Sequence, residues 1–313
     1  MFRDEGFRPK TKTVNFILMD GGLGDHVAAL VAVDYAIKTY TWIKILVWVP
    51  DYFLDFAKNL LPPNTQVKSF TQMKGSYEPH KPTKTTKWDG HTSPMKMHGV
   101  DYAFLKLLDE TCKTRDYLRI KPAVNKFFAL PQRYVVVTTG FTAKVREFPA
   151  EEINKLAAWI SNQGIQPVFL GQKMITTGSA ATIKGNFSVD IDYTIGTDLI
   201  DKTTLLEAAS IMQDAMAIVG VDNGLLHVAA CTDVPIVAGF TTVSPEMRRP
   251  TRNGICGYKF YEVIPDDDLK CRFCQVNTNF LYSHDYKKCL YDDNLCTKQM
   301  TAEKFIKHLE NIL

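Results

Sequence analysis

Short apolar runs alternate with helical stretches through both halves of this 313-residue chain. In the first half, residues 14–19 and 44–49 are predicted strands, because their apolar residues show no helical period. Small and apolar residues at helical spacing lie between these strands, over 25–38. Strands that alternate with helices in this way form parallel sheets with covered faces, so the pattern predicts an α/β fold.

The same alternation restarts in the second half. We expect further strands at 134–138, 167–170, 217–221 and 235–239, and helices at 52–61, 101–110, 151–163, 203–214, 224–231 and 303–313. The pattern loosens around 121–131, which places a domain boundary there and predicts two Rossmann-like domains, 1–130 and 131–313. In such sheets, ligands bind beyond the carboxyl ends of the strands.

The composition is that of an ordinary globular protein, with 45% hydrophobic and 23% charged residues. The net charge is only +3, so any electrostatic preference must come from a local patch. The first ten residues lack the apolar run of a signal peptide, and no stretch approaches the roughly 18 apolar residues of a membrane span. We therefore expect a cytosolic, reducing compartment and leave open a peripheral position at the inner membrane.

A glycine-rich turn, residues 20–25, joins the first predicted strand to the first predicted helix. Glycines such as Gly24 let the backbone turn tightly and let a ligand approach closely. A dinucleotide fingerprint would need a third glycine at position 27, which is Val27, so the spacing argues against an NAD site. Asp25 suits either a helix N-cap or a reactive site, and the motif alone leaves both readings open.

Two motifs follow predicted strand ends in the second half. The run 221–227 enters a helix whose free amides and partial positive charge suit a diphosphate, with His227 on the first turn. The alternative is a capped helix with a hydrogen-bonded histidine. The run 138–149 supplies small residues and two cations, Lys144 and Arg146, which could neutralise a leaving diphosphate. A solvated loop is the alternative there.

Four of the seven cysteines crowd near the end of the chain. A leading Cys-x-x-Cys pair with two further thiols can hold zinc tetrahedrally, although the second pair is spaced more widely than usual. The alternatives are free thiols or redox-dependent disulfides, and we expect no catalytic role in any case. The four candidates for structural zinc are Cys271, Cys274, Cys289 and Cys296.

Taken together, these motifs resemble those of glycosyltransferase family 9, the ADP-heptose:lipopolysaccharide heptosyltransferases and their relatives. Gly24-Asp25 matches the family's Gly-Asp turn, and Arg146-Glu147-Phe148-Pro149 resembles its Lys/Arg-x-aromatic-Pro element, with arginine in the usual place of lysine. The run 222–230 matches its most characteristic motif, with Asn223 in place of a hydroxyl residue. Pro235, the turn Gly239-Phe240-Thr241 and the late cysteine cluster also have counterparts in the family.

The resemblance implies a GT-B fold, in which two Rossmann-like domains face each other across a cleft. It implies an acceptor domain at 1–130 and a nucleotide-sugar domain at 131–313, and it leaves open whether the last helix packs back onto the first domain. The implied reaction is an inverting sugar transfer that needs no metal, with an ADP- or UDP-linked donor. Asp25 is then the general base, and Arg146 stabilises the leaving diphosphate. The expected donor-binding residues are Gly24, Thr139, Gly140, Lys144, Asp222, Asn223, Gly224, His227 and Thr241.

A long polar segment, 67–99, carries six lysines and three histidines against Glu78 and Asp89. The N-terminal domain of this fold holds the acceptor, so the segment predicts an anionic acceptor such as phosphorylated lipopolysaccharide core. Nucleic acid also fits, including a modified DNA base. The alternative is a solvated, mobile loop. The expected acceptor contacts are Lys81, Lys84, Lys87, Trp88 and His98.

Two other functions share this architecture. A nucleotide-sugar epimerase would need no macromolecular acceptor and would leave the basic segment unexplained. A non-catalytic sugar-nucleotide-binding protein would leave Asp25 without a role. Turnover of a bound nucleotide sugar separates the three classes.

Overall fold

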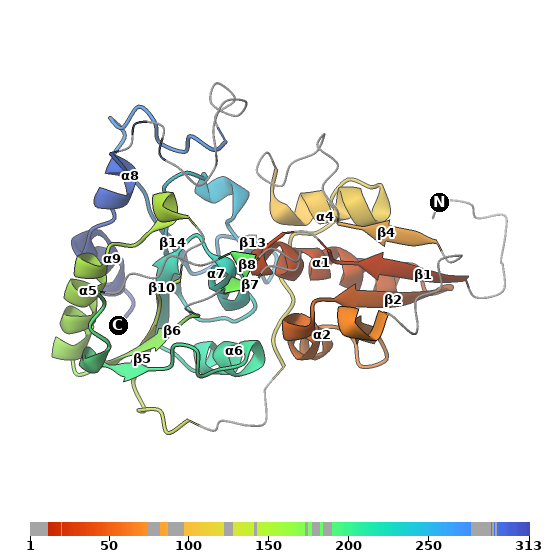
Figure 1. Ribbon diagram of the computed structural model, residues 1–313, viewed down its shortest axis with the longest axis horizontal. Coiled ribbons are helices and arrows are strands. Elements are labelled where there is room, and N and C mark those ends of the chain that lie inside the picture. The colour runs from red at the N-terminus through yellow and green to blue at the C-terminus, as the bar shows by residue number, and fades with distance from the viewer. Residues whose placement is uncertain are drawn as a thin grey trace.

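Two α/β units lie side by side in the computed structural model (Figure 1). Each contains its own parallel sheet, and the chain between 109 and 133 connects them. The structure describes residues 12–19, 21–73, 82–86, 97–121, 128–140, 143–172, 175–176, 182–183, 190–276, 289, 291 and 293–313.

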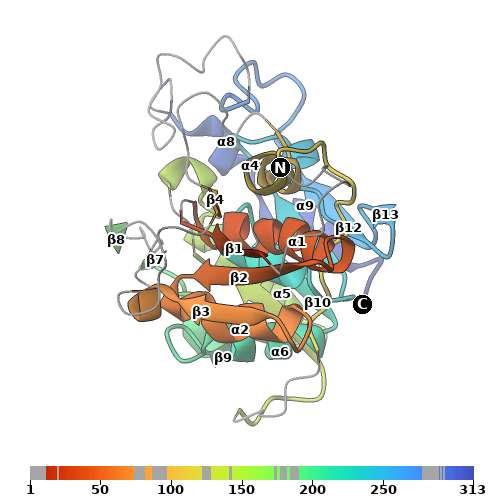
Figure 2. The ribbon, with the colours of Figure 1, turned by 90° about the vertical axis from the view of Figure 1, so that its right-hand side faces the viewer.

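The N-terminal unit is built on a four-stranded parallel sheet with the order β3-β2-β1-β4. Its strands are β1 (Lys12–Ile17), β2 (Ile43–Val49), β3 (Gln66–Ser69) and β4 (Thr83–Thr85). Its helices are α1 (Leu23–Thr39), α2 (Leu54–Leu60) and α4 (Gly99–Leu108), with the 3-10 turns η1 (Asp51–Phe53) and η2 (Phe70–Gln72). Helix α1 contacts both α2 and α4, and Figure 2 shows α1 and α4 near each other above the strands. The expected loop 67–99 therefore contains part of β3 and all of β4.

The C-terminal unit is built on a six-stranded parallel sheet with the order β14-β11-β10-β5-β6-β9. Its strands are β5 (Tyr134–Thr138), β6 (Gln166–Leu170), β9 (Thr197–Asp198), β10 (Ala217–Val221), β11 (Ile236–Gly239) and β14 (Phe260–Val263). This is the doubly wound Rossmann order, in which the chain reverses direction across the sheet between β5 and β10. Two short hairpins accompany it, β7 (Ile175–Thr176) with β8 (Thr182–Ile183) and β12 (Thr251–Arg252) with β13 (Ile255–Cys256).

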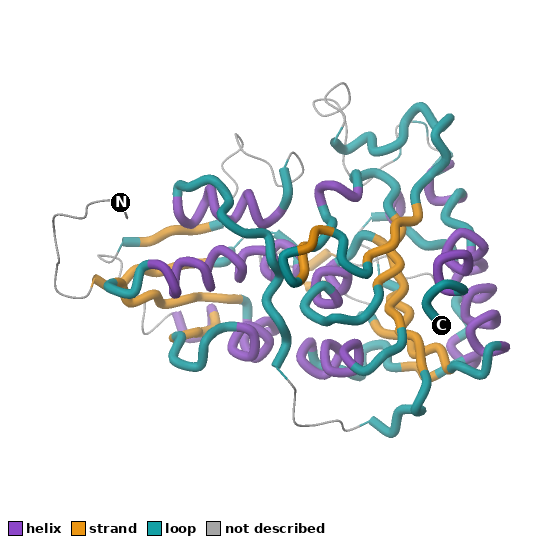
Figure 3. The backbone as a smooth tube through the Cα atoms, turned by 180° about the vertical axis from the view of Figure 1, so that it is seen from behind, coloured by secondary structure: helices purple, strands orange, loops and turns teal. Residues whose placement is uncertain are grey.

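The helices of the C-terminal unit are α5 (Ala150–Asn162), α6 (Leu205–Gln213), α7 (Gly224–Ala229), α8 (Leu295–Lys298) and α9 (Ala302–Leu309), with the 3-10 turns η3 (Lys144–Arg146), η4 (Tyr193–Ile195) and η5 (Pro245–Met247). Helix α9 packs on α5, β11 and β14, and the C-terminus lies on that side of the molecule (Figure 3). Phe305 of α9 stacks on Phe148 with ring centroids 4.4 Å apart. The last helix therefore packs on its own unit. In the described ranges, none of the helices combines the length and the hydropathy needed to cross a bilayer.

The two units share an apolar interface in which α1 packs against α7. Gly24 and Gly224 make this approach possible. A Cβ on Gly24 would lie 2.4 Å from Cδ2 of His227, and a Cβ on Gly224 would lie 2.7 Å from Cβ of Leu23. Since real Cβ atoms do not approach that closely, the two helix starts can meet in this way only because both positions are glycine.

A fully buried arginine, Arg252, holds together the segments around β11. Its Nη1 donates to the carbonyl oxygens of Thr232 at 3.0 Å and Val234 at 2.9 Å. Its Nη2 donates to the carbonyl oxygens of Tyr258 and Lys259. One guanidinium thus satisfies four backbone acceptors, two before β11 and two before β14.

We expect Arg252→Leu to lower the free energy of unfolding by about 3 kcal/mol. A hydrogen bond from a charged donor contributes about 1.5–3 kcal/mol, and the variant removes such a bond from Val234 and Tyr258, whereas Thr232 and Lys259 keep a second donor. A loss of that size should lower the melting temperature by about 6–12 °C, measured by thermal denaturation. The matched control is Arg115→Leu, which removes an exposed ion pair with Asp101 whose contribution should be about 0–1 kcal/mol. Equal shifts in the two variants would contradict the role of Arg252.

Candidate active site

The carboxyl ends of β1, β5 and β10 carry the polar residues that the sequence singles out. The loop after β1 leads to Asp25, the loop after β5 carries Thr139, and the loop after β10 carries Asp222. In a doubly wound sheet, the crevice at the strand-order reversal is the usual ligand site, and β5 and β10 flank that reversal. The contact between Gly24 and His227 brings the loop after β1 against the loop after β10.

Asp25 is the third residue of α1, and its side chain is half-buried. Its Oδ2 accepts a hydrogen bond of 2.8 Å from the backbone N–H of Gly22, which is the N-cap residue. Gly21 has a φ of +105° and packs so closely that a Cβ there would lie 2.6 Å from Oδ2 of Asp25. Asp25 is therefore a partner of the N-cap and not the N-cap itself. Its carboxylate is held in one orientation by the turn in front of the helix.

Tyr52 lies near this carboxylate, after the end of β2. Burial and the charge of Asp25 both raise the pKa of the Tyr52 phenol, so it stays protonated at neutral pH. A hydrogen bond of 3.1 Å joins its hydroxyl to Nδ1 of His26. Tyr52 thus adds a fixed aromatic side chain to the surroundings of Asp25.

Asp222 is buried between two arginines. Its Oδ2 lies 3.4 Å from Nη1 of Arg146, and its Oδ1 lies 3.4 Å from Nε of Arg248. Burial raises the pKa of the carboxyl, but Arg146, Arg248 and other neighbours outweigh that effect and lower it below its ordinary value. Asp222 is therefore an anion at neutral pH, and the three side chains together carry a net charge of +1.

Two hydrogen bonds hold Arg146 and its turn in place. Arg146 ends η3, and its Nη2 donates a hydrogen bond of 2.8 Å to Oε1 of Gln275. The hydroxyl of Thr241 donates a hydrogen bond of 2.6 Å to the carbonyl oxygen of Val145. Thr241 was expected to contact the donor. In this structure its hydroxyl hydrogen bond positions the turn that carries Arg146.

The start of α7 is capped by Asn223. Its Oδ1 accepts from the N–H of Leu226 at 3.1 Å, and its Nδ2 donates to the carbonyl oxygen of Gly140 at 2.8 Å. Asn223 therefore ties the end of β10 to the end of β5. The helix has only six residues, so the macrodipole expected to bind a diphosphate is short, and one of its first amides is already taken.

His227 is buried, and a hydrogen bond of 2.8 Å joins its Nδ1 to the hydroxyl of Tyr117. Burial and the charge of Arg248 lower the pKa of His227, so the ring is neutral near pH 7. In this structure, Asn223 caps α7 and His227 is a hydrogen-bonded histidine, as in the alternative interpretation of the run 221–227. Gly224 and Gly24, also expected to bind the donor, serve the contact between the two units.

The remaining donor-binding candidates lie around the end of β5. Thr139 is buried and its N–H donates to the carbonyl oxygen of Leu170. A Cβ added at Gly140 would meet none of the described atoms within 4 Å, so the backbone there is open. The Lys144 side chain is 67% exposed and lies 4.0 Å from Glu147. These three positions stay predictions for donor contact.

Only two of the five expected acceptor contacts lie in the described ranges. Lys84 forms an ion pair with Asp109. His98 is buried and caps α4, because its Nδ1 accepts from the N–H of Val100 at 3.2 Å and its Nε2 donates to the carbonyl oxygen of Arg249 at 3.1 Å. Both ring nitrogens of His98 thus have partners within the protein, and its contact with the acceptor stays a prediction. Lys81, Lys87 and Trp88 lie outside the described residues.

The four late cysteines are free thiols, and Cys274 and Cys296 are buried. Burial first, and then neighbouring thiols, raise the pKa of Cys274 to about 11 and that of Cys296 to about 12. Across the described part of the chain, no group of three or more His, Cys, Asp or Glu side chains is arranged to hold a metal ion. The structural zinc site expected at Cys271, Cys274, Cys289 and Cys296 stays a prediction.

Four residues of this site were not predicted from the sequence: Tyr52, Tyr117, Arg248 and Gln275. Arg248 offers a weak signal, since two arginines precede Pro250 in the loop that follows β11. Tyr117 and Gln275 lie outside every motif, and only the fold brings them to His227 and Arg146.

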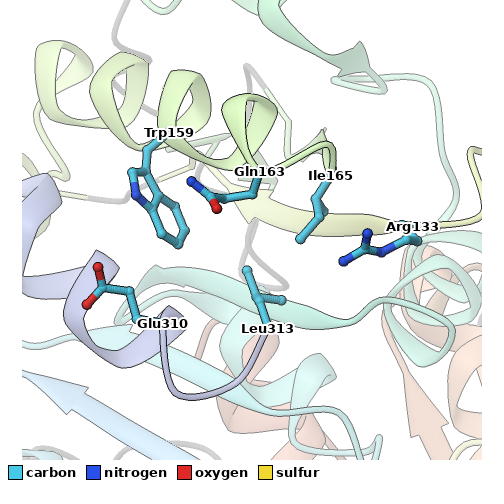
Figure 4. Close-up of a pocket in the computed structure, with 6 residues that line it drawn as sticks. All are labelled: Arg133, Trp159, Gln163, Ile165, Glu310 and Leu313. Carbon is cyan, nitrogen blue, oxygen red and sulfur yellow. The ribbon is translucent and has the colours of Figure 1, made fainter.

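A pocket of about 270 Å³ lies elsewhere on the C-terminal unit (Figure 4). Arg133 and Ile165 directly precede β5 and β6, so the pocket is at the amino ends of these strands. That is the edge opposite to Asp222, and doubly wound sheets bind their ligands at the carboxyl edge. The lining residues are Arg133, Trp159, Gln163, Ile165, Glu310 and Leu313.

Comparison with known proteins agrees with this geometry. The sequence model of glycosyltransferase family 9 (heptosyltransferase) matches residues 102–265, more than half of the chain. No curated protein matches the chain.

Among solved structures, the chain is similar to TibC, an iron-containing dodecameric glycosyltransferase from enterotoxigenic Escherichia coli. The TM-score is 0.74, with 15% identity over 98% of this chain and 77% of that chain. A second TibC structure contains ADP-D-β-D-heptose.

The chain is also similar to ADP-heptose lipopolysaccharide heptosyltransferase II from Escherichia coli, with a TM-score of 0.63 and 13% identity over 96% of this chain and 98% of that one. A glycosyltransferase of family 9 from Veillonella parvula gives a TM-score of 0.60 and 13% identity over 98% of both chains. At such identities the likeness is one of fold, and the fold is GT-B.

The burial of His98 makes stability depend on pH. Burial lowers the pKa of His98 in the folded protein to about 4, below its ordinary value of 6.5. Between these values the unfolded chain binds a proton that the folded protein does not, so stability falls as the pH falls through this window. We expect His98→Asn, which keeps a capping side chain, to flatten that slope in urea unfolding measured at a series of pH values from 7 to 4.

The matched control for this prediction is His308→Asn on α9, which leaves the cap of α4 intact. It should keep the slope of the unsubstituted protein. A slope in His98→Asn as steep as that of the unsubstituted protein would show that His98 does not supply it.

Proposed function

The chain belongs to glycosyltransferase family 9, and from this premise we propose that it moves a sugar from a nucleotide-diphosphate donor to an acceptor hydroxyl, with inversion and without a metal ion. An ADP-linked heptose is the donor that we favour, because TibC, whose fold is similar, binds ADP-D-β-D-heptose. UDP-linked sugars are the next class to test.

The observation that carries this proposal is the placement of two opposite charges on facing units. Asp25 begins α1 on one side of the contact between α1 and α7, and Asp222 with its two arginines precedes α7 on the other. Sugar transfer needs a base on the acceptor side and positive charge on the side of the leaving group.

In the proposed reaction, Asp25 accepts the proton of the acceptor hydroxyl while the oxygen of that hydroxyl attacks the anomeric carbon. The bond from that carbon to the diphosphate breaks, and the leaving oxygen gains negative charge. Arg146 stabilises this charge, and Lys144 is exposed enough to swing toward it. Attack opposite to the leaving group inverts the anomeric configuration.

We propose an anionic acceptor, such as a phosphorylated core oligosaccharide, on the strength of the basic segment 67–99. Of its candidates, Lys81, Lys87 and Trp88 continue to support this proposal. His98 and Lys84 are weaker candidates, because His98 caps α4 and Lys84 pairs with Asp109.

Asp25→Asn should lower turnover by about 10²–10⁴-fold, the usual contribution of a general base. Asparagine can still accept the hydrogen bond from Gly22, so the start of α1 should stay folded. The donor is first identified by thermal shift against ADP-, UDP-, GDP- and CDP-sugars, since a ligand of the native state raises the melting temperature. Turnover is then measured as release of the nucleoside diphosphate.

The control for this substitution is Asp55→Asn, an exposed acidic residue on α2. It should leave both turnover and donor binding unchanged. Full turnover in Asp25→Asn would remove the proposed base, and interconversion of the sugar without transfer would favour an epimerase.

Arg146→Ala should lower kcat by about 10²–10³-fold, the range seen when a preorganised stabiliser of developing charge is removed. Arg146→Lys should recover part of this loss, because lysine is the usual residue of the family at the matching position. Both variants are compared by steady-state kinetics, after a check that they melt like the unsubstituted protein. Near-normal kcat in Arg146→Ala would contradict the assignment.

A further inference from the structure

We propose that Arg248 is a second donor-binding arginine, which pairs with Asp222 in the free protein and binds the diphosphate of the nucleotide sugar. This inference rests on the proposed function and adds a residue that none of the sequence motifs contains. It follows from the charge of the cluster around Asp222, from its incomplete hydrogen bonds and from the anchoring of the loop that carries Arg248.

The charge of the cluster is the first reason. Arg146 and Asp222 alone would form a neutral pair, and the adjacent His227 is uncharged near pH 7. Arg248 is therefore the side chain that gives this buried cluster its net positive charge. A diphosphate carries at least two negative charges, so a neutral pair would attract it only weakly in comparison with a cluster of net charge +1.

The hydrogen bonding of the cluster is the second reason. Both contacts to Asp222 are 3.4 Å long, whereas a charged N–H···O hydrogen bond is usually about 2.7–2.9 Å. Within the described residues, Oδ2 of Asp222 and Nε of Arg146 have no hydrogen-bond partner. Buried charged groups that are so loosely paired gain free energy from a ligand that supplies further acceptors. Phosphate oxygens supply acceptors for the guanidinium groups.

The anchoring of the loop is the third reason. Arg248 follows η5, and the residue after it is fixed on two sides. The Nε of Arg249 pairs with Glu262 of β14 at 2.5 Å, and its carbonyl oxygen accepts from His98 of the N-terminal unit. The backbone at Arg248 is thus held where the two units meet. Its side chain is only 10% exposed and lies against Asp222.

The pairing with Asp222 explains how a buried arginine can stay in place before the donor binds. The negative charge of Asp222 offsets the repulsion between the two guanidinium groups. Neither of its contacts has the short bidentate geometry of a strong arginine–carboxylate pair. The phosphate oxygens of the donor can therefore accept hydrogen bonds from Arg248 without breaking a strong hydrogen bond to Asp222.

The test compares Arg248→Gln with Arg248→Lys, because the two side chains differ in charge and both leave Arg146 on Asp222. Binding of ADP, UDP, adenosine and uridine is measured by isothermal titration calorimetry. We expect Arg248→Gln to weaken binding of the diphosphate by about 10-fold or more. Arg248→Lys should keep most of the affinity, and nucleosides without phosphate should bind both variants as they bind the unsubstituted protein.

Arg133→Gln is the matched control, since this arginine lies at the opposite edge of the sheet (Figure 4). It should bind the diphosphate like the unsubstituted protein. A merely structural role of Arg248 would weaken nucleoside and diphosphate binding alike, and that result would overturn the inference.

The outcomes separate this inference from the proposed function. If the unsubstituted protein binds ADP or UDP and Arg248→Gln binds it equally well, the inference fails and the proposed function stands. If the unsubstituted protein binds neither diphosphate, the proposed function fails, and the inference fails with it.

Discussion

The close approach of α1 and α7 is the constraint on which the site depends. Each helix follows the carboxyl end of a strand at the strand-order reversal of its own sheet, so the two helix starts bring the two ligand-binding edges together. Gly24 and Gly224 permit the contact, because a side chain at either position would collide with the other unit. The segment that connects the two units adds Tyr117, whose hydroxyl forms a hydrogen bond with His227.

The main role of Asp222 is to position its two arginines, and its contribution to the stability of the fold is secondary. A buried carboxylate is costly unless it is paired, and a buried ion pair seldom stabilises a protein more than apolar residues would. The arrangement is better explained by position: Asp222 fixes Arg146 from η3 and Arg248 from the loop after η5 at one place. Gln275 supports it by accepting a hydrogen bond from the Arg146 guanidinium, and Thr241 by bonding to the η3 turn that carries Arg146.

The strands that could be predicted are those whose residues form a continuous apolar run, because such a run indicates burial directly. The strands β5 and β10 were predicted to the residue, because continuous apolar runs end at polar or small residues. The strands β4 and β9 were missed, since Thr-Lys-Thr and Thr-Asp contain no apolar run and pair only because a neighbouring strand is present.

The same distinction holds for the candidate site. Asp25 and Asp222 were predictable because each follows a predicted strand end. Arg248 was not, because its partner lies on another loop and no local pattern relates the two. His98 was expected to contact an acceptor because it lies in a lysine-rich segment, and only the fold shows that it caps α4.

The base and the cations of the proposed mechanism are therefore built in different ways. The orientation of Asp25 is local: Gly21, Gly22 and the first turn of α1 determine it within a few residues. The positive cluster is not local, because Arg146, Asp222 and Arg248 come from three loops that meet only when β5, β10 and β11 are assembled in one sheet. Substitutions in the core of the C-terminal unit should therefore disturb the cluster at a distance, whereas the carboxylate of Asp25 should keep its orientation as long as α1 is folded.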